Sequence, residues 1–279
     1  MWQSILRNYL WSAVKSAATS STRGEQGKVQ TSPKHCDVGI VFALSQESNR
    51  LFDRLSVVST THGHGFVARD GYLNDKRIII VEAGVGREAA ARATDALIVA
   101  HRPKLVISAG FAGGLREGIA KGHFVMADSV QSDAGKRLSI DLKLDRSTQP
   151  TIHVGPLLTV DRIVSTPAEK RTLHERTGAI AVDMESFAVA ETCQTLMTPF
   201  LSVRVVSDTV ADRLPPEIGR LITKPTRVRQ VGFALGAMLR RPSVAKDLVK
   251  LQQSALDLSD RLAKFLVELL NQIPPRATP

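Results

Sequence analysis

Val106-Ile-Ser-Ala-Gly-Phe-Ala-Gly-Gly-Leu115 is the stretch of the sequence that decides the fold. Leu105–Ser108 is a short apolar run of the kind that fills a buried strand, and Ala109–Leu115 is rich in glycine and predicts a turn. α/β proteins place their ligands where a buried strand ends in such a turn. The segment therefore predicts an α/β sheet with a ligand site at the edge where its strands end.

The residues on both sides of this segment alternate in the same way between strand and helix patterns. The predicted strands cover residues 38–43, 77–82, 105–108, 180–183 and 200–206, and the predicted helices cover residues 47–55, 87–101 and 185–196. This alternation favours a largely parallel sheet covered on both faces. We expect a three-layer α/β/α domain with a mixed twisted sheet.

Two further strand ends carry acidic residues. The strand that begins Val38-Gly-Ile-Val-Phe runs out to Glu47. Later, Ala181-Val-Asp-Met-Glu-Ser186 is followed by Arg204-Val-Val-Ser-Asp208. Because the carboxyl ends of parallel strands meet at one edge of a sheet, these acids are candidates for a common site.

The two ends of the chain differ from its middle. With 279 residues, the chain is long enough for one large α/β domain and an appendage. We expect an N-terminal segment at residues 1–36, a catalytic domain at residues 37–226 and a helical C-terminal extension at residues 227–279. In the extension, apolar residues step by four and three alternately from Val244 to Leu269, which is a heptad seam. That seam would pack on its own domain, pair with a second copy or cover a cleft.

The first 15 residues share an aromatic helical face that carries both tryptophans and few acids. Such a face is compatible with peripheral membrane contact. The alternatives are a flexible tail, a targeting segment or a start codon assigned too far upstream. We expect a cytoplasmic protein, with membrane association through residues 1–15 as the alternative.

The net charge of +10 invites a nucleic-acid partner, but its distribution argues against one. Residues 37–212 carry 20 basic and 21 acidic residues, whereas residues 213–250 carry nine basic and two acidic residues. The excess charge thus belongs to the ends of the chain and not to a groove across the domain. We expect a small-molecule substrate and no nucleic acid.

The sequence gives little indication of metal, redox or dinucleotide chemistry. Two cysteines, Cys36 and Cys193, do not make a disulfide framework, and His62-Gly-His64 lacks further ligands at metal-binding spacing. Gly84-Val-Gly86 imitates a dinucleotide fingerprint, but the next strand ends in Ser108 instead of an acid. We expect neither a metal nor an organic cofactor.

Taken together, these elements resemble the nucleoside phosphorylase and nucleosidase superfamily, and most closely the 5′-methylthioadenosine/S-adenosylhomocysteine nucleosidases. The resemblance implies cleavage of the N-glycosidic bond of a 5′-substituted adenosine through a ribosyl cation. It further implies that Asp208 donates a proton to N7 of the base, Glu185 holds the ribose hydroxyls, and Glu47 deprotonates the water. The substrate-binding residues that it implies are Gly84, Phe111, Ala112, Gly113, Ile163, Val164, Asp183, Met184 and Ser207.

The same resemblance favours water over phosphate as the attacking group. Phosphorylases of this superfamily clamp phosphate with arginines where this chain has Glu47 and Ser108, and with a serine where it has Phe111. Family members of the nucleosidase kind complete their 5′ pocket with a second subunit, which implies a homodimer.

Two alternatives remain open. The segment 203–216 and the later Leu239-Arg-Arg-Pro242 resemble the hopanoid-associated phosphorylase branch, which would remove adenine from an adenosyl-lipid. A non-catalytic nucleoside-binding protein is the second alternative, although binding alone would not need Glu47, Glu185 and Asp208 together.

Overall fold

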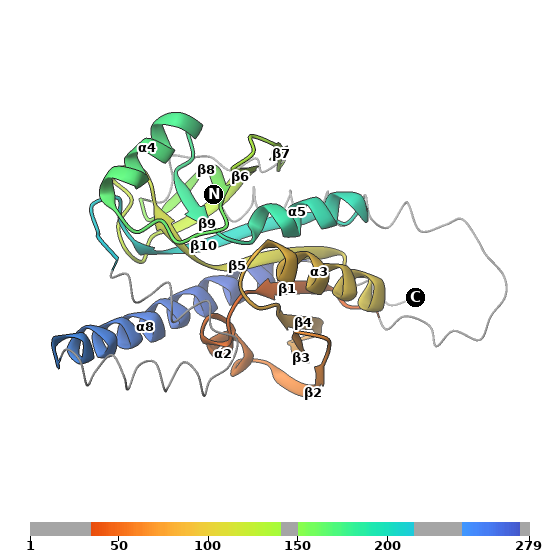
Figure 1. Ribbon diagram of the computed structural model, residues 1–279. Helices are drawn as coiled ribbons and strands as arrows, with labels where there is room; N and C mark the ends of the chain where they lie inside the picture. The colour runs from red at the N-terminus through yellow and green to blue at the C-terminus, as the bar shows by residue number, and fades with distance from the viewer. Residues whose placement is uncertain (1–34, 141–149, 215–241, 274–279) are drawn as a thin grey trace.

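The computed structural model describes residues 35–140, 150–214 and 242–273 (Figure 1). The aromatic segment 1–15, the predicted boundary at residues 226 and 227, and most of the basic stretch 213–250 lie outside the described residues. The predictions made for those parts of the chain therefore remain predictions.

Ten strands form one mixed sheet, and five helices surround it. The strands are β1 (Val38–Phe42), β2 (Ser56–His62), β3 (Val67–Leu73), β4 (Lys76–Glu82), β5 (Leu105–Gly114), β6 (Phe124–Ser132), β7 (Arg137–Ser139), β8 (Ile152–Thr159), β9 (Ala181–Asp183) and β10 (Phe200–Asp208). The described helices are α2 (Ser45–Phe52), α3 (Arg87–His101), α4 (Pro167–Thr177), α5 (Ser186–Thr195) and α8 (Pro242–Gln272).

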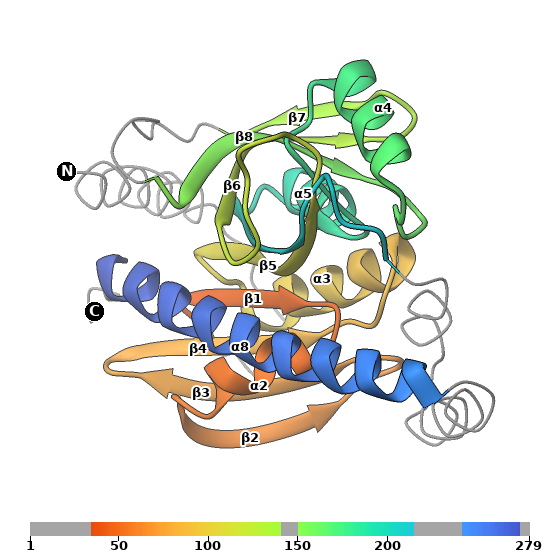
Figure 2. The same ribbon diagram turned by 90° about the vertical axis from the view of Figure 1, so that its left-hand side faces the viewer.

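Strand β5 lies at the junction of two parts of this sheet (Figure 2). Its residues Leu105–Ser108 pair with β1, and its residues Val106–Gly113 pair with β10 on the other side. Its last residues, Gly113 and Gly114, pair with β9. The path from β10 through β6, β8 and β9 returns to β5 and closes a small barrel, while β1, β4, β3 and β2 continue as an open arm.

The structure corrects two predictions for this region. Ala109–Leu115 was expected to form a turn, but the strand continues to Gly114 because β10 and then β9 satisfy its backbone groups. The sheet was expected to be largely parallel, yet only half of its ten pairings are parallel. The antiparallel pairs are the two in the β2–β4 meander, the two by which β9 joins β5 and β10 joins β6 in the barrel, and the β6–β7 pair. The mixed α/β architecture itself is confirmed.

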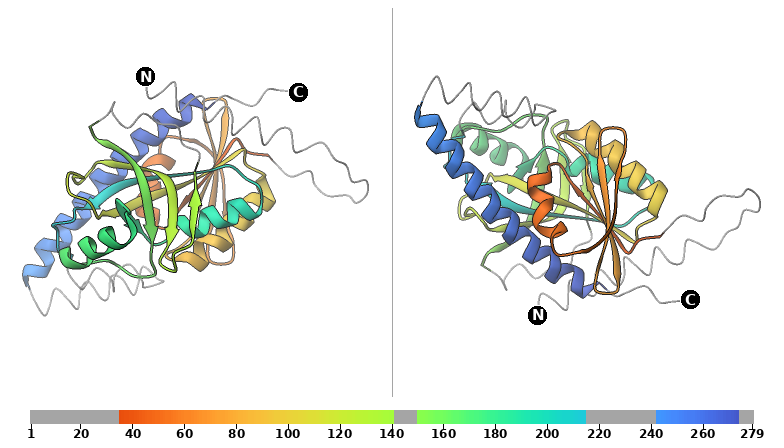
Figure 3. Two further views of the ribbon diagram at one scale, coloured as in Figure 1. Left: turned by 90° about the horizontal axis from the view of Figure 1, so that it is seen from above. Right: turned by 90° about the horizontal axis from the view of Figure 1, so that it is seen from below.

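The helices cover the sheet in pairs. Helix α3 packs beside α5 on one face, and α2 packs beside α8 on the opposite face (Figure 3). Two helical layers thus enclose the sheet, as the sequence predicted. Helix α3 has the predicted bounds, and its first residue follows Gly86, which has a positive φ of 98°.

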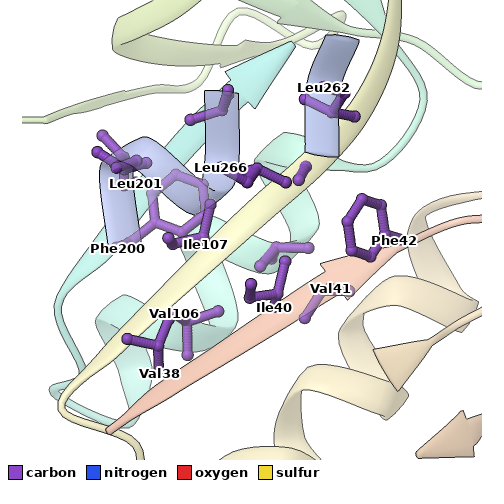
Figure 4. Close-up of a cluster of buried hydrophobic side chains, with 14 of the residues drawn as sticks. Val38, Ile40, Val41, Phe42, Val106, Ile107, Phe200, Leu201, Leu262 and Leu266 are labelled. Carbon is purple, nitrogen blue, oxygen red and sulfur yellow. The ribbon is translucent and has the colours of Figure 1, made fainter. Parts of the chain in front are cut away.

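One large apolar core joins the sheet to the C-terminal helix. Side chains from β1, β5 and β10 meet Leu262 and Leu266 of α8 (Figure 4), and both leucines are fully buried. Burying each such side chain contributes about 1.5–3 kcal/mol. Of the three arrangements considered for the heptad seam, packing on its own domain is the one adopted over residues 258–273. The buried stripe also includes Leu270 and Ile273, because a helix seated on a sheet buries a broader face than a coiled-coil seam.

In the part of the chain that the structure describes, no helix is long and apolar enough to cross a membrane.

Candidate active site

Two of the predicted acids, Glu47 and Asp208, lie against the glycine-rich half of β5, and Glu185 lies close enough to Glu47 for the two charges to interact. Gly110 pairs with Arg204 of β10, and Gly113 pairs with both Val182 of β9 and Asp208 of β10. The ends of three strands therefore meet over a short stretch of backbone that carries few side chains. This stretch of β5 forms the floor of the candidate site.

Glu47 belongs to the first turn of α2, where its carboxylate is buried and held by three backbone donors. Its Oε2 accepts hydrogen bonds from the N–H groups of Leu44 at 3.0 Å and Ala43 at 3.2 Å, which caps the helix. Its Oε1 accepts the N–H of Phe111 at 2.9 Å. Burial raises the pKa of Glu47, although the Phe111 N–H and the charge of Arg204 oppose that rise. A carboxylate with a raised pKa is better suited to take a proton from water near neutral pH.

Gly110 is required for the close approach of Glu47 to β5. A Cβ atom at residue 110 would lie 2.7 Å from Oε1 of Glu47 and 3.3 Å from Nη1 of Arg204. Contacts below about 3 Å between such atoms are repulsive, so any side chain here would displace the carboxylate.

Glu185 is the residue before the first turn of α5, and its side chain turns away from that helix to the turn before α3. Its Oε1 accepts the N–H of Gly86 at 2.8 Å. Desolvation, together with the nearby charges of Asp183 and Glu47, raises the pKa of Glu185 to about 8, against the lowering effects of Gly86 and Arg204. Two acids with raised pKa values in one buried site indicate a functional site.

The buried ion pair of Arg204 and Asp183 lies close enough to both glutamates for its charges to act on them. Arg204 donates from Nε to Asp183 Oδ2 at 2.9 Å, and from Nη2 to the hydroxyls of Ser108 at 2.7 Å and Ser186 at 2.9 Å. Asp183 also accepts the Thr159 hydroxyl through its other oxygen at 2.6 Å. The sequence predicted Asp183 as a substrate-binding residue, but protein donors occupy both of its carboxylate oxygens. It holds Arg204 in place instead.

Asp208 ends β10 at the far side of the floor. Its Oδ1 accepts the Ser207 hydroxyl at 2.6 Å, and its Oδ2 accepts Nζ of Lys170 at 2.5 Å. A Cβ atom at Gly113 would lie 3.2 Å from Oδ2, so this glycine also leaves room for a carboxylate.

The other residues that the sequence predicts to bind substrate fall into a partly exposed group and a buried group. Gly84, Phe111, Gly113, Ile163, Met184 and Ser207 retain partial exposure, whereas Ala112 and Val164 are buried. Val164 belongs to the apolar cluster beneath the loop after β8, so its side chain serves packing. The N–H of Gly84, which has a φ of 88°, donates to the carbonyl of Ala43 at 3.0 Å and so ties the turn before α3 to the loop that Glu47 caps.

A cavity of about 580 Å³ adjoins this arrangement. It lies at the N-terminus of α3 and is lined by Val85, Gly86, Arg87, Glu88, Ala89, Arg92 and Asp161. Its volume falls in the range of small-molecule sites. Because Gly86 also binds Glu185, the cavity opens beside one of the candidate catalytic acids.

Sequence reasoning missed two buried cations. Arg204 was quoted in the strand motif without a role, although an arginine inside a strand of apolar residues indicates a buried ion pair. Lys170 was not noticed, although it shares a helical face with Leu173 and Thr177. Among the described residues, no three His, Cys, Asp or Glu side chains gather closely enough to hold a metal ion.

Comparisons with known proteins identify the family and the fold of this chain. The family described as the Phosphorylase superfamily matches residues 37–143 and 140–224. The chain is 28% identical over 195 residues to a 5′-methylthioadenosine/S-adenosylhomocysteine nucleosidase of Staphylococcus haemolyticus, covering 61% of this chain and 86% of the relative. It is 27% identical over 199 residues to the nucleosidase of the same name from Baumannia cicadellinicola, covering 63% of this chain and 86% of the relative.

Solved structures show the same fold at lower identity. The 5′-methylthioadenosine/S-adenosylhomocysteine nucleosidase of S. pneumoniae, bound to a transition-state inhibitor, aligns with a TM-score of 0.65 at 20% identity, covering 85% of this chain and all of that one. Futalosine hydrolase of Helicobacter pylori aligns with a TM-score of 0.63 at 16% identity, covering 85% of this chain and 97% of that one. With the matched family spanning most of the domain and the fold shared throughout, this chain belongs to the phosphorylase superfamily.

Proposed function

We propose that this protein is an N-ribosyl hydrolase that releases adenine from 5′-modified purine nucleosides. The observation that carries the proposal is that Glu47 and Asp208 both lie against residues 110–113 of β5, with Glu185 close enough to Glu47 for their charges to interact. The names of its relatives support the same class of reaction.

Each acid suits one task in this reaction. Glu47, fixed by three backbone donors, takes a proton from the water that attacks C1′ of the ribose. Glu185 accepts the ribose hydroxyls and favours the positive charge that develops on the sugar. When the bond between C1′ and N9 breaks, its electron pair stays on the base. Asp208 then delivers a proton to N7 of the base, which neutralises that charge.

The charges around Glu47 favour water over phosphate. A phosphate anion beside Glu47 and Glu185 would be repelled by the carboxylate of Glu47 in the form that accepts a proton from water. Arg204, which lies close enough to act on both, already binds Asp183 and two serine hydroxyls. Glu47 itself stands where the phosphorylases have an arginine that clamps phosphate.

The decisive experiment measures adenine release from 5′-methylthioadenosine with and without phosphate and identifies the sugar by mass. Free methylthioribose without phosphate is the expected product. A requirement for phosphate and a sugar 1-phosphate product would refute hydrolysis. Asp208→Asn should lower kcat by about 10²–10⁴ and keep nucleoside affinity, whereas equal loss of both would count against an acid role.

The substrate panel extends the test to the 5′ substituent. S-Adenosylhomocysteine and an adenosyl-lipid in detergent should be assayed beside methylthioadenosine. Turnover of the lipid alone would move the substrate class to the hopanoid-associated branch. Nucleoside binding without turnover of any of the three would favour a binding protein. We also propose a homodimer, which sedimentation of the full chain tests.

A further inference from the structure

Lys170 lies wholly buried in the first turn of α4, and its side chain reaches the end of β10. Its ammonium group contacts the candidate acid Asp208, and the relative exposure of its side chain is 0%. A buried lysine is costly unless it is paired. Leu173 lies on the same face of α4 and packs in an apolar cluster. If residue 170 served packing alone, an apolar side chain would suit this position better than a lysine.

The hydrogen bonds of Lys170 define its charge. Nζ donates to Asp208 Oδ2 at 2.5 Å, to the carbonyl of Thr209 at 2.6 Å and to the carbonyl of Asp212 at 3.0 Å. All three partners are acceptors, so the nitrogen needs three N–H groups and is an ammonium ion. A neutral amine would have only two.

The ion pair defines the charge of the partner. The Oδ2 atom of Asp208 faces the ammonium, and the Ser207 hydroxyl lies 2.6 Å from Oδ1 and 3.2 Å from the carbonyl of Ala112. The wholly buried ammonium of Lys170 needs an anionic partner, and Asp208 is the carboxylate in contact with it, so the proton of this pair lies on Nζ.

The two carbonyls that bind Lys170 belong to a fixed turn. The Asp212 carboxylate accepts the N–H of Thr209 at 2.7 Å and its hydroxyl at 2.8 Å. These bonds lower the pKa of Asp212 and keep the turn closed over the ammonium. Lys170 is therefore held in one place, directly behind the carboxylate.

We propose that Lys170 is the positioning residue that supplies the leaving-group proton through Asp208. This inference rests on the proposed function. As the C1′–N9 bond breaks and its electron pair passes to the base, N7 takes a proton from Asp208, and Asp208 takes one from Nζ of Lys170. The attacking water gives its proton to Glu47, so the net charge of the site is unchanged. The neutral amine then has one hydrogen too few for its three acceptors and regains a proton from solvent.

The test compares two leaving groups. Lys170→Met keeps an unbranched side chain that is one atom shorter and removes the ammonium group with its proton. With 5′-methylthioadenosine we expect kcat to fall about 100-fold and KM to change less than threefold. With 4-nitrophenyl 5-methylthioriboside, whose phenolate departs without a proton, we expect kcat to stay within about threefold of the unaltered protein.

The outcomes separate a proton route from a structural role. Equal losses on both leaving groups would mean that Lys170 only holds the fold, and unimpaired adenine release would overturn the proton route while leaving the hydrolase intact. If the unaltered protein cleaved neither compound, the proposed function would fail together with this inference.

A second variant covers the case in which Lys170→Met fails to fold because Asp208 is left buried without its partner. In an Asp208→Asn background no unpaired carboxylate remains. We expect Lys170→Met to lower adenine release less than about twofold further in that background, because Lys170 acts only through Asp208. A further tenfold loss would overturn the proposal.

Discussion

Replacing Glu185 with glutamine should make the folded protein more stable at neutral pH, although it removes a candidate catalytic group. The pKa of Glu185 is raised from 4.5 to about 8 in the folded protein, chiefly by desolvation. Between pH 4.5 and about pH 8, Glu185 therefore keeps its proton in the folded protein, whereas in the unfolded chain it has already released it. In this window, stability falls as pH rises.

The expected size follows from the shift. One proton difference changes the free energy of unfolding by about 1.4 kcal/mol per pH unit. Between pH 5.5 and 7.5 the unaltered protein should therefore lose about 2–3 kcal/mol relative to Glu185→Gln. In a domain of this size the difference in Tm should grow by roughly 5–10 °C over the same range. Glutamine keeps an oxygen for the N–H of Gly86, so the local hydrogen bond remains.

The assay is thermal unfolding followed by circular dichroism at fixed ionic strength and at several pH values. Glu175→Gln is the matched control, because Glu175 is an exposed residue of α4. Its difference from the unaltered protein should not vary with pH. A Glu185→Gln difference that stays constant within about 0.5 kcal/mol, or that shrinks as pH rises, would refute the reasoning.

Three other substitutions test the floor, the base and the core. Gly110→Ala should lower kcat/KM for adenine release at least about tenfold and the free energy of unfolding by about 1–3 kcal/mol. The reason is that its Cβ atom would lie 2.7 Å from Oε1 of Glu47, and normal activity would contradict this prediction. Glu47→Gln should lower kcat by about 10²–10⁴ with KM changed less than about threefold, and steady-state kinetics would expose any smaller effect. Leu266→Ala should cost about 2–5 kcal/mol in urea unfolding, against less than about 0.5 kcal/mol for Leu256→Ala, whose side chain is 44% exposed.

The sequence predicted the elements whose signals are local. Arg87–His101 was predicted to the residue, because an alanine-rich segment between Gly86 and Pro103 has clear ends. Ala109–Gly114 was misread as a turn for the same reason. Its glycines favour a turn locally, but pairing with β10 and β9 overrides that preference, and the site needs those glycines for close approach.

The candidate site was predictable in part. The sequence pattern places three acids, Glu47, Glu185 and Asp208, after predicted strands. Because the carboxyl ends of neighbouring strands meet at one edge of a sheet, these acids could be predicted to share a site. Lys170 could not be assigned in this way, because Glu169-Lys-Arg171 reads as a solvated helical face. Only the packing of α4 against the turn after β10 turns that side chain inward. Charges that act across a fold are therefore harder to predict than the elements that carry them.

Helix α8 has a consequence for the order in which the protein is assembled during synthesis. Its buried face packs on β1, β5 and β10, and the hydroxyl of Ser259 donates to the carbonyl of Gln46, next to Glu47. Leu262 is synthesised 54 residues after Asp208. Until α8 has been synthesised, the apolar face of the sheet stays in water, and the helix that bears Glu47 lacks its neighbour. A nascent chain can thus hold every candidate catalytic acid and still be unable to arrange them.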